Sequence, residues 1–381
     1  MRSLSEQTIG IILVLYWFFT LMAWYSVRQV MRERAGILPH ILPSLYWGWS
    51  VVQSLLFLFF YSFPPEAIKG HDFTTYFQYN GLLVADFVSK IPLMGSSFLI
   101  LPLKNPRRAA RLALMGLILS AGLFLVIGWG MTLGRTRLQV HEAVIKPENL
   151  PAALDGMRII QISDLHAGSF RSPGTGARMK RICNEFQPDL LFFTGDLVNN
   201  FSWEVSSEIS WLAGLKAQKG KYAIMGNHDY GDYSHWETPQ AKAANLEGIK
   251  RSYSRLGFRL LLNESEKVAY NGDSLYVTGV ENWGNPPFPV YADLQKAGEG
   301  IPATAFRILL THDPAHWDAM RESLQRYPLT FAGHTHGFQW GIKLAGIPFS
   351  TAWFRYPRWG GIYHCDSAFL VVNRGTGTIG L

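Results

Sequence analysis

The first third of the chain is dominated by four long apolar stretches. Each is close to the roughly 20 residues that a helix needs to cross a hydrocarbon core of about 30 Å. The first stretch lacks a small-residue cleavage site and is followed by more apolar stretches, which favours a retained span over a signal peptide. We therefore expect an all-α transmembrane region over residues 1–134, with helices at 8–29, 41–63, 80–103 and 110–132.

After about residue 132 the pattern changes to short apolar runs that alternate with helical segments. Strands separated by helices predict a layered α/β fold for residues 135–381. The expected strands are 158–163, 190–194, 222–225, 275–280, 306–311 and 329–332. The expected helices lie near 176–187, 203–215 and 239–256.

Five of these strands are followed directly by a short polar cluster. In chain order the clusters read D-L-H-A-G, G-D-L-V-N-N, G-N-H-D-Y-G, H-D-P and G-H-T-H-G. Ligands of open α/β sheets bind beyond the carboxyl ends of the strands, so all five clusters are expected at one sheet edge. Each cluster alone is weak evidence, because such sequences are common in loops. Their combination predicts a functional site.

The clusters supply imidazole, carboxylate and amide-oxygen donors. The candidate ligands and neighbours are Asp164, His166, Asp196, Asn227, His228, His312, His334 and His336. This donor set suits Mn, Fe, Zn, Co or Ni better than Ca or Mg. Cysteine is absent from the clusters, which argues against a structural cysteine-based zinc site. The donors are too many for one ion and about enough for two.

The net charge of +7 is concentrated near the N-terminus. Residues 1–132 hold 10 basic and 5 acidic side chains, whereas the remainder holds 25 and 23. The α/β region is therefore nearly neutral and has no dense basic stripe. Because it lacks the electrostatic footprint of a nucleic-acid-binding protein, no nucleic-acid partner is expected.

The basic residues of the apolar region are unevenly distributed among its short loops. The first loop has Arg28, Arg32 and Arg34, the third has Lys104, Arg107, Arg108 and Arg111, and the second has only Lys69. Basic loops stay in the cytoplasm. This places both termini and the α/β region on the extracytoplasmic side of a plasma (inner) membrane, in a multi-pass protein.

Two further residue pairs leave alternatives open. Asp86 and Lys90 lie four residues apart within the third apolar stretch. They form an ion pair that holds the helices together, or they take part in substrate access. Cys183 and Cys365 lie far apart in sequence and are either free or paired.

The ordered series D-L-H (164–166), G-D (195–196), G-N-H-D (226–229), H (312) and G-H-T-H (333–336) resembles the calcineurin-like metallophosphoesterases. The likeness extends to membrane-anchored bacterial members. It implies a two-sheet α/β sandwich with two metal ions at its edge. One ion would be held by Asp164, His166, Asp196 and His336, and the other by Asp196, Asn227, His312 and His334. His228 would face the scissile phosphate, with Asp229 behind it.

The chemistry expected of such a centre is hydrolysis. Two cations about 3.5–4 Å apart lower the pKa of a bridging water and clamp the phosphoryl oxygens. The resulting hydroxide would attack phosphorus in line, while His228 stabilises the developing charge or protonates the leaving group. Asp229 would orient the ring of His228. Glu281, Asn282 and Arg374 are candidate substrate contacts, and a plain loop role is the alternative for Glu281 and Asn282.

The substrate is expected to be a phosphodiester, pyrophosphate or phosphomonoester in a lipid-linked or membrane-proximal molecule, such as a phospholipid or glycolipid. Residues 348–363 are rich in aromatic side chains, with Arg355 and Arg358 among them. This composition suits a lipid headgroup interface, or a locally packed aromatic cluster. Some family members cleave UDP-linked lipid A precursors, but an extracytoplasmic location argues against such a substrate. The alternative function is a non-catalytic metal-binding membrane sensor or scaffold, which would be expected to have lost ligands.

Overall fold

The structure is a computed structural model that describes residues 5–32, 38–62, 71–170, 173–205, 207–284, 289–339, 342–344 and 347–378. It divides into two compact units, Met1–Arg137 and Leu138–Ile379. Arg34 and Lys69, which enter the predicted membrane orientation, lie outside the described residues.

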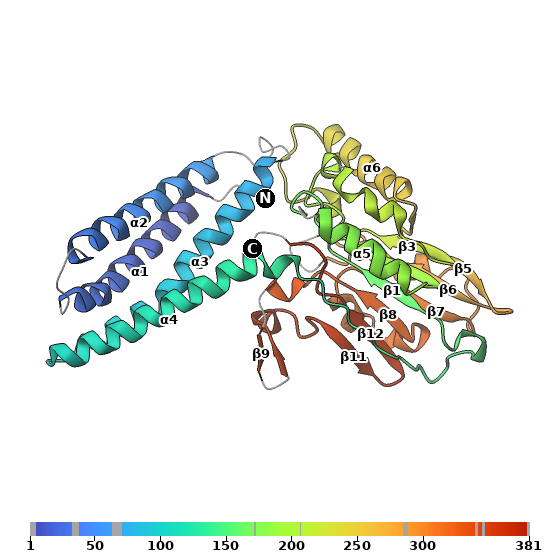
Figure 1. Cartoon of the computed structure of the whole chain (residues 1–381). Coiled ribbons are helices and arrows are strands. Elements are labelled where there is room, and N and C mark those ends of the chain that lie inside the picture. The colour runs from blue at the N-terminus through green and yellow to red at the C-terminus, as the bar shows by residue number, and fades with distance from the viewer. Residues whose placement is uncertain are drawn as a thin grey trace. The chain divides into compact units, whose positions relative to one another are not determined.

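The first unit contains four long helices: α1 (Glu6–Arg32), α2 (Leu38–Ser62), α3 (His71–Ile100) and α4 (Pro106–Thr132) (Figure 1). Within the described residues, these four helices are long and apolar enough to cross a membrane. α4 begins as its sequence dictates, because Oδ1 of Asn105 accepts the backbone N–H groups of Arg107 and Arg108 at 3.0 and 3.2 Å. Pro106 occupies the first helical position, where no backbone donor is needed.

Asp86 and Lys90 form a buried ion pair inside this unit. The Lys90 Nζ lies 2.7 Å from Oδ2 of Asp86. It also donates to the Tyr16 hydroxyl at 3.0 Å and to Oγ1 of Thr20 at 3.1 Å, both on α1. From α2, Nε1 of Trp49 donates to Oδ1 of Asp86 at 2.9 Å. All three N–H bonds of the ammonium are thus matched, and the geometry is that of a pair that joins three helices.

The second unit is built on two sheets. The first has the parallel order β1 (Ile159–Ile162), β2 (Leu190–Thr194), β3 (Gly220–Ile224) and β4 (Arg259–Leu260). The second has the order β11 (Gly361–Cys365), β12 (Ala368–Val372), β8 (Leu329–Ala332), β7 (Phe306–Leu310), β6 (Asp273–Gly279) and β5 (Glu264–Tyr270). Its four central strands are parallel and its two edge strands antiparallel. A hairpin joins β9 (Ile342–Leu344) to β10 (Ile347–Phe349).

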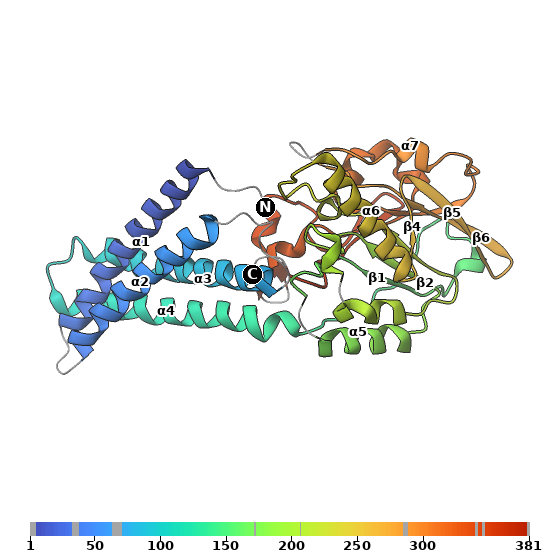
Figure 2. The same ribbon diagram turned by 90° about the horizontal axis from the view of Figure 1, so that it is seen from above.

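The two sheets face each other across an apolar core. Phe192 of β2 and Phe331 of β8 meet there with ring centroids 5.2 Å apart. The helices α5 (Pro173–Glu185) and α6 (Pro239–Arg255) cover the other face of the first sheet (Figure 2). The short helices α7 (Leu294–Ala297) and α8 (Ala315–Ala319) pack against the second sheet. The predicted two-sheet α/β sandwich after four apolar helices is therefore confirmed.

Short 3₁₀ helices complete the chain: η2 (Gly134–Thr136), η3 (Ala152–Leu154), η4 (Ser202–Glu204), η5 (Ser207–Gly214), η6 (Asn227–Tyr230), η7 (Arg321–Arg326), η8 (His336–Gln339) and η9 (Thr351–Phe354). The helix predicted near 203–215 is present as two short 3₁₀ helices, η4 and η5, and not as one continuous helix. The Glu204 carboxylate turns back to accept the backbone N–H groups of Asn199, Asn200 and Phe201 at 2.6–2.8 Å, which holds the chain in a tight turn. Cys183 and Cys365 are both free.

Candidate metal centre and active site

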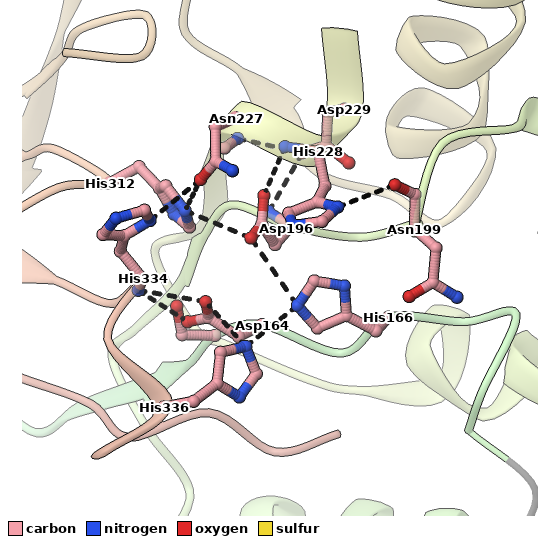
Figure 3. A network of polar contacts seen from close by, with 12 residues as sticks. Asp164, His166, Asp196, Asn199, Asn227, His228, Asp229, His312, His334 and His336 are labelled. Atoms are coloured by element: carbon pink, nitrogen blue, oxygen red, sulfur yellow. Dashed lines mark hydrogen bonds and ion pairs between the residues drawn. The ribbon is translucent and has the colours of Figure 1, made fainter. Parts of the chain in front are cut away.

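The structure brings the five polar clusters together at the carboxyl ends of β1, β2, β3, β7 and β8 (Figure 3). In each case a strand ends and the polar side chains that follow it lie close to those of the other clusters. The predicted residues that meet there are Asp164, His166, Asp196, Asn227, His228, His312, His334 and His336. The site is thus assembled from both sheets, which is why no single segment of the sequence contains it.

A first group of donors consists of Asp164, His166, Asp196 and His336. One nitrogen or carboxylate oxygen from each lies within 4.8 Å of all the others, a spacing that could hold a metal ion. The Nε2 atoms of His166 and His336 are 2.9 Å apart. Nε2 of His336 lies 3.4 Å from Oδ1 of Asp164, and Nε2 of His166 lies 3.6 Å from Oδ2 of Asp196.

A second group of donors adjoins the first through Asp196. Oδ2 of Asp196 lies 3.2 Å from Nε2 of His312, which is itself 3.0 Å from Oδ1 of Asn227. The same amide oxygen lies 2.8 Å from Nδ1 of His334. The other ring nitrogen of His312 is 2.7 Å from the backbone oxygen of Thr194. A carbonyl oxygen only accepts hydrogen bonds, so Nδ1 of His312 carries a proton. Nε2 is then the nitrogen that faces the other candidate metal ligands, Asp196 and Asn227.

The backbone at these positions adopts a conformation that side chains rarely take. Asp164, His166, Asp196, His334 and His336 have positive φ angles between 49° and 72°. Non-glycine residues with positive φ are uncommon and cost energy, so they persist where the surrounding fold enforces them. Their concentration in one place shows that the fold, rather than local preference, sets the direction of these five side chains.

The buried charges at the centre are strongly coupled. Burial lowers the pKa of His312, but the carboxylates of Asp196 and Asp164 outweigh it and raise the value to about 10. Burial would raise the pKa of Asp196, yet the neighbouring histidines, chiefly His312, hold it well below its usual range. Burial lowers the pKa of His336 to about 3. Asp196 is therefore a carboxylate whose charge is balanced by a proton on His312, and a cation could replace that proton.

The donor set fits metal ions. Imidazole nitrogens and carboxylate oxygens come together in a buried place, although apolar packing does not favour bringing polar atoms together. The Nε2 atoms of two histidines even face each other at hydrogen-bond distance. The remaining ring nitrogen of His166, Nδ1, is buried without a hydrogen-bond partner. Since Nε2 of His166 faces Asp196 and His336, Nε2 is the atom that would bind an ion, and Nδ1 is left to an ordered water. These residues are suited to hold Mn, Fe, Zn or a similar ion.

His228 lies beside both groups of donors. Its backbone N–H donates to Oδ1 of Asp196 at 2.9 Å, and its ring meets that of His166 edge-on at 4.9 Å. Nδ1 of His228 is 2.8 Å from the backbone oxygen of Asn199 (Figure 3). Because that oxygen only accepts, Nδ1 carries a proton and Nε2 is the nitrogen available for chemistry.

The expectation that Asp229 orients the ring of His228 is wrong. The Asp229 carboxylate accepts the backbone N–H groups of Asp196, Leu197, Val198 and Gly226 at 2.9–3.2 Å, and the hydroxyl of Tyr253 at 2.8 Å. Burial raises its pKa to about 7, Asp196 adds to this, and the donors oppose it. Asp229 therefore fixes the turn after β2, which carries Asp196, and leaves the histidine ring to Asn199.

Comparison with known proteins identifies this arrangement. The family model of the calcineurin-like phosphoesterases matches residues 157–338, a range that contains every donor described above. Residues 157–338 belong to the calcineurin-like phosphoesterase family. The chain is accordingly a hydrolase that acts on phosphate esters.

Three relatives match about three fifths to two thirds of this chain. The uncharacterized metallophosphoesterase YkuE of Bacillus subtilis is 29% identical, over 66% of this chain and 82% of that protein. The UDP-2,3-diacylglucosamine pyrophosphatase LpxG of Chlamydia trachomatis is 28% identical, over 60% of this chain and 81% of that protein. A transmembrane protein with metallophosphoesterase domain from Danio rerio is 28% identical, over 64% of this chain and 54% of that protein. The four apolar helices and the relative from Danio rerio, which is named as a transmembrane protein, support a membrane protein.

Two of the three predicted substrate contacts have structural partners within the second unit. The Glu281 carboxylate accepts the Tyr230 hydroxyl at 3.0 Å and the amide of Asn263 at 2.9 Å. Arg374 is exposed, stacks over the ring of Trp359 and lies 3.2 Å from Nε2 of His141. These contacts suit structural roles.

Asn282 differs from them. Its side chain is 3% exposed, and its amide oxygen is without a hydrogen-bond partner. Its backbone oxygen accepts the N–H groups of Tyr291 and Ala292.

Three residues at the site were not found from the sequence, namely Asn199, Tyr233 and Tyr356. Tyr233 belongs to no recognisable motif, yet its ring stacks on that of His228 with centroids 4.3 Å apart. Its hydroxyl accepts a hydrogen bond from the side-chain amide of Asn227 at 2.6 Å. The hydroxyl of Tyr356 lies 3.1 Å from Nε2 of His334. The only sequence signal for Tyr233 is that it follows the G-N-H-D cluster closely along the chain. Tyr356 lies far from the clusters in sequence and reaches the site only through the tertiary fold.

Proposed function

We propose that the chain is a membrane-anchored phosphoesterase with a two-ion centre. Asp164, His166, Asp196 and His336 would hold one ion, and Asp196, Asn227, His312 and His334 the other. The observation that carries this proposal is the position of Asp196, whose Oδ2 lies 3.6 Å from Nε2 of His166 in one group and 3.2 Å from Nε2 of His312 in the other. A carboxylate shared between two sets of donors suits a pair of closely spaced ions.

The ions, when bound, would lower the pKa of a water that attacks phosphorus and neutralise charge on the phosphoryl oxygens. The protein residues supply the rest. Protonated at Nε2, His228 would give its proton to the leaving oxygen as the P–O bond opposite the attacking water breaks. The backbone oxygen of Asn199 would stabilise the imidazolium through Nδ1. Burial lowers the pKa of His228 and so disfavours its protonated form. The negative charge of the bound phosphate would act in the opposite direction and favour the protonated form.

The bond cleaved would be a phosphodiester, pyrophosphate or phosphomonoester of a lipid-linked or membrane-proximal molecule. The relative named as a UDP-2,3-diacylglucosamine pyrophosphatase supports a substrate with acyl chains and a pyrophosphate. The four apolar helices support access to such a molecule from the membrane.

We further propose a plasma (inner) membrane location in which the second unit, hereafter the catalytic unit, lies outside the cytoplasm. Seven basic residues in the first and third loops against Lys69 in the second support this orientation. A reporter enzyme that is active only outside the cytoplasm, fused after Leu381, would give activity. Activity of a cytoplasm-specific reporter at the same position would reverse the orientation.

Hydrolysis by the purified full chain tests the function. Bis-p-nitrophenyl phosphate and p-nitrophenyl phosphate would be supplied with Mn²⁺ or with EDTA. We expect metal-dependent turnover that is abolished in Asp196→Asn, and retained in Asp273→Asn, which removes an exposed carboxylate at the start of β6. The preferred ester would distinguish a diesterase from a monoesterase. Two bound ions without turnover of these compounds or of a diacyl pyrophosphate would instead favour the metal-binding sensor or scaffold.

A further inference from the structure

The aromatic residues between 348 and 363 divide into an inward and an outward group. Tyr356 reaches His334, Trp359 is buried, and the Tyr363 hydroxyl bonds the backbone of Gly360. Trp353 and Phe354 face outward, with 58% and 76% of their surface exposed. Among the described residues of the catalytic unit, these are the two most exposed tryptophan or phenylalanine side chains. Part of the segment is therefore a locally packed aromatic cluster, and part of it presents aromatic side chains to the outside.

The outward pair stands on a firmly held support. Ser350 begins η9, because its Oγ accepts the backbone N–H of Ala352 at 3.1 Å and donates to the backbone oxygen of Gly337 at 2.5 Å. Ala352 is completely buried. Gly337 directly follows His336, so η9 is attached to the segment that carries two of the site histidines. The exposure of Trp353 and Phe354 is therefore built into an ordered element.

The composition of this tip matches a lipid surface. The Trp353 and Phe354 rings lie 5.4 Å apart, and the next residue, Arg355, is exposed. Aromatic rings favour the membrane–water interface, and an adjacent cation attracts anionic headgroups. A bilayer is also close at hand for every copy of the chain, since α4 ends at Thr132 and the catalytic unit starts at Leu138.

We propose that Trp353, Phe354 and Arg355 form a lipid-contacting tip through which the catalytic unit docks on the bilayer surface. Tyr356, the next residue, lies against His334, so the tip and the donor groups belong to one continuous segment. A phosphate carried by a lipid headgroup would then reach the site without the lipid leaving the membrane. Only this last consequence rests on the proposed function, because docking itself requires no catalysis.

Depth-dependent quenching in the full chain tests the tip. Phe354→Cys, in a Cys365→Ser background that keeps the buried Cys183, would carry an environment-sensitive fluorophore. The protein would be reconstituted in nanodiscs with anionic lipids, with or without bromine atoms on the acyl chains. Trp203→Cys is the matched control, since Trp203 is an exposed aromatic residue (43%) on another element of the same unit.

We expect quenching by brominated lipids that is at least several-fold stronger at position 354 than at 203. Equal quenching at both positions, or none at 354, would overturn the proposal. A label at position 354 could instead show an apolar environment that is unaffected by brominated lipids and strengthens as more protein is added per nanodisc. That result would indicate contact with a second copy of the chain and would also overturn the proposal. Unchanged hydrolysis of bis-p-nitrophenyl phosphate by Trp353→Ala/Phe354→Ala would show that any failure concerns docking and leaves the enzymatic function untouched.

Discussion

Nδ1 of His228 is held by the backbone oxygen of Asn199, 2.8 Å away. A main-chain partner has two consequences. The tautomer of the ring is set by the fold and survives any change of the Asn199 side chain. The nitrogen that faces the donor groups is Nε2, which suits a proton donor to a leaving group.

The role of His228 predicts a dependence on the leaving group. His228→Ala should lower kcat about 10²- to 10⁴-fold for esters with a poor leaving group such as phenol. The loss should be much smaller for p-nitrophenol, which departs without a proton. Asn199→Ala keeps the backbone oxygen and should preserve the ratio of the two rates. Measuring kcat with both esters decides the matter, and an equal loss for both would refute proton donation by His228.

Asp229→Asn should destabilise the catalytic unit rather than alter the state of His228. An amide in place of the carboxylate presents an N–H group to a set of N–H and O–H donors. We expect a loss of about 2–4 kcal/mol in the free energy of unfolding, measured by denaturant titration at pH 8.5, where the carboxylate is ionised. Tyr253→Phe removes one of the five hydrogen bonds and should cost about 1 kcal/mol. A fully stable Asp229→Asn with an altered pH–rate profile would contradict this role.

Tyr356→Phe should weaken metal binding. The phenol lies 3.1 Å from Nε2 of His334, and groups that bond a ligand's second nitrogen typically contribute about 10- to 100-fold in metal affinity. Titration against a competing chelator measures this affinity. Tyr363→Phe, which loses only two hydrogen bonds to the Gly360 backbone in the same segment, is the control. If both variants bind metal like the native chain, Tyr356 has no part in holding His334.

Gly226→Ala should abolish metal binding. A Cβ at this position would lie 2.2 Å from Oδ1 of Asp196 and 2.7 Å from Cε1 of His312, so two donors would have to move. Elemental analysis of the purified variant should find far less than the native metal content. Gly174→Ala places its methyl group in open space and should retain the native content. Native metal content in Gly226→Ala would show that the centre can rearrange.

Acid sensitivity should depend partly on His316. Burial lowers its pKa to about 4, and Thr311 and the stacked Trp283 ring enclose it. Between pH 6.5 and 4 the unfolded chain takes up a proton that the folded chain refuses, so stability falls as the pH drops. The loss is about 3 kcal/mol at 1.36 kcal/mol per pKa unit. His316→Gln should flatten the curve of unfolding free energy against pH in this window. His364→Gln, on an exposed strand, should leave it steep.

The sequence predicted the central strands and all eight residues that meet at the site, because buried parallel strands are continuous apolar runs and their polar ends are conspicuous. The helix predicted at 203–215 forms as two 3₁₀ helices, and the sequence did not reveal that the Glu204 carboxylate accepts backbone N–H groups of the preceding turn. It also missed β5, whose E-S-E-K-V-A-Y sequence is that of a half-exposed edge strand. Asn199 and Tyr356 could not be found because one acts through its backbone and the other through a contact across 22 positions.

The contacts of Lys90 also bear on how the protein is made. Its ammonium is satisfied by α1 and by Asp86, and Asp86 in turn needs Trp49 of α2. A lone α3 entering a bilayer would carry two charges with most of their partners missing, at a cost of several kcal/mol. The Asp86–Lys90 pair itself lies within α3, but its remaining hydrogen bonds come from the two helices that precede it in the chain. We therefore expect the stable insertion of α3 to depend on α1 and α2.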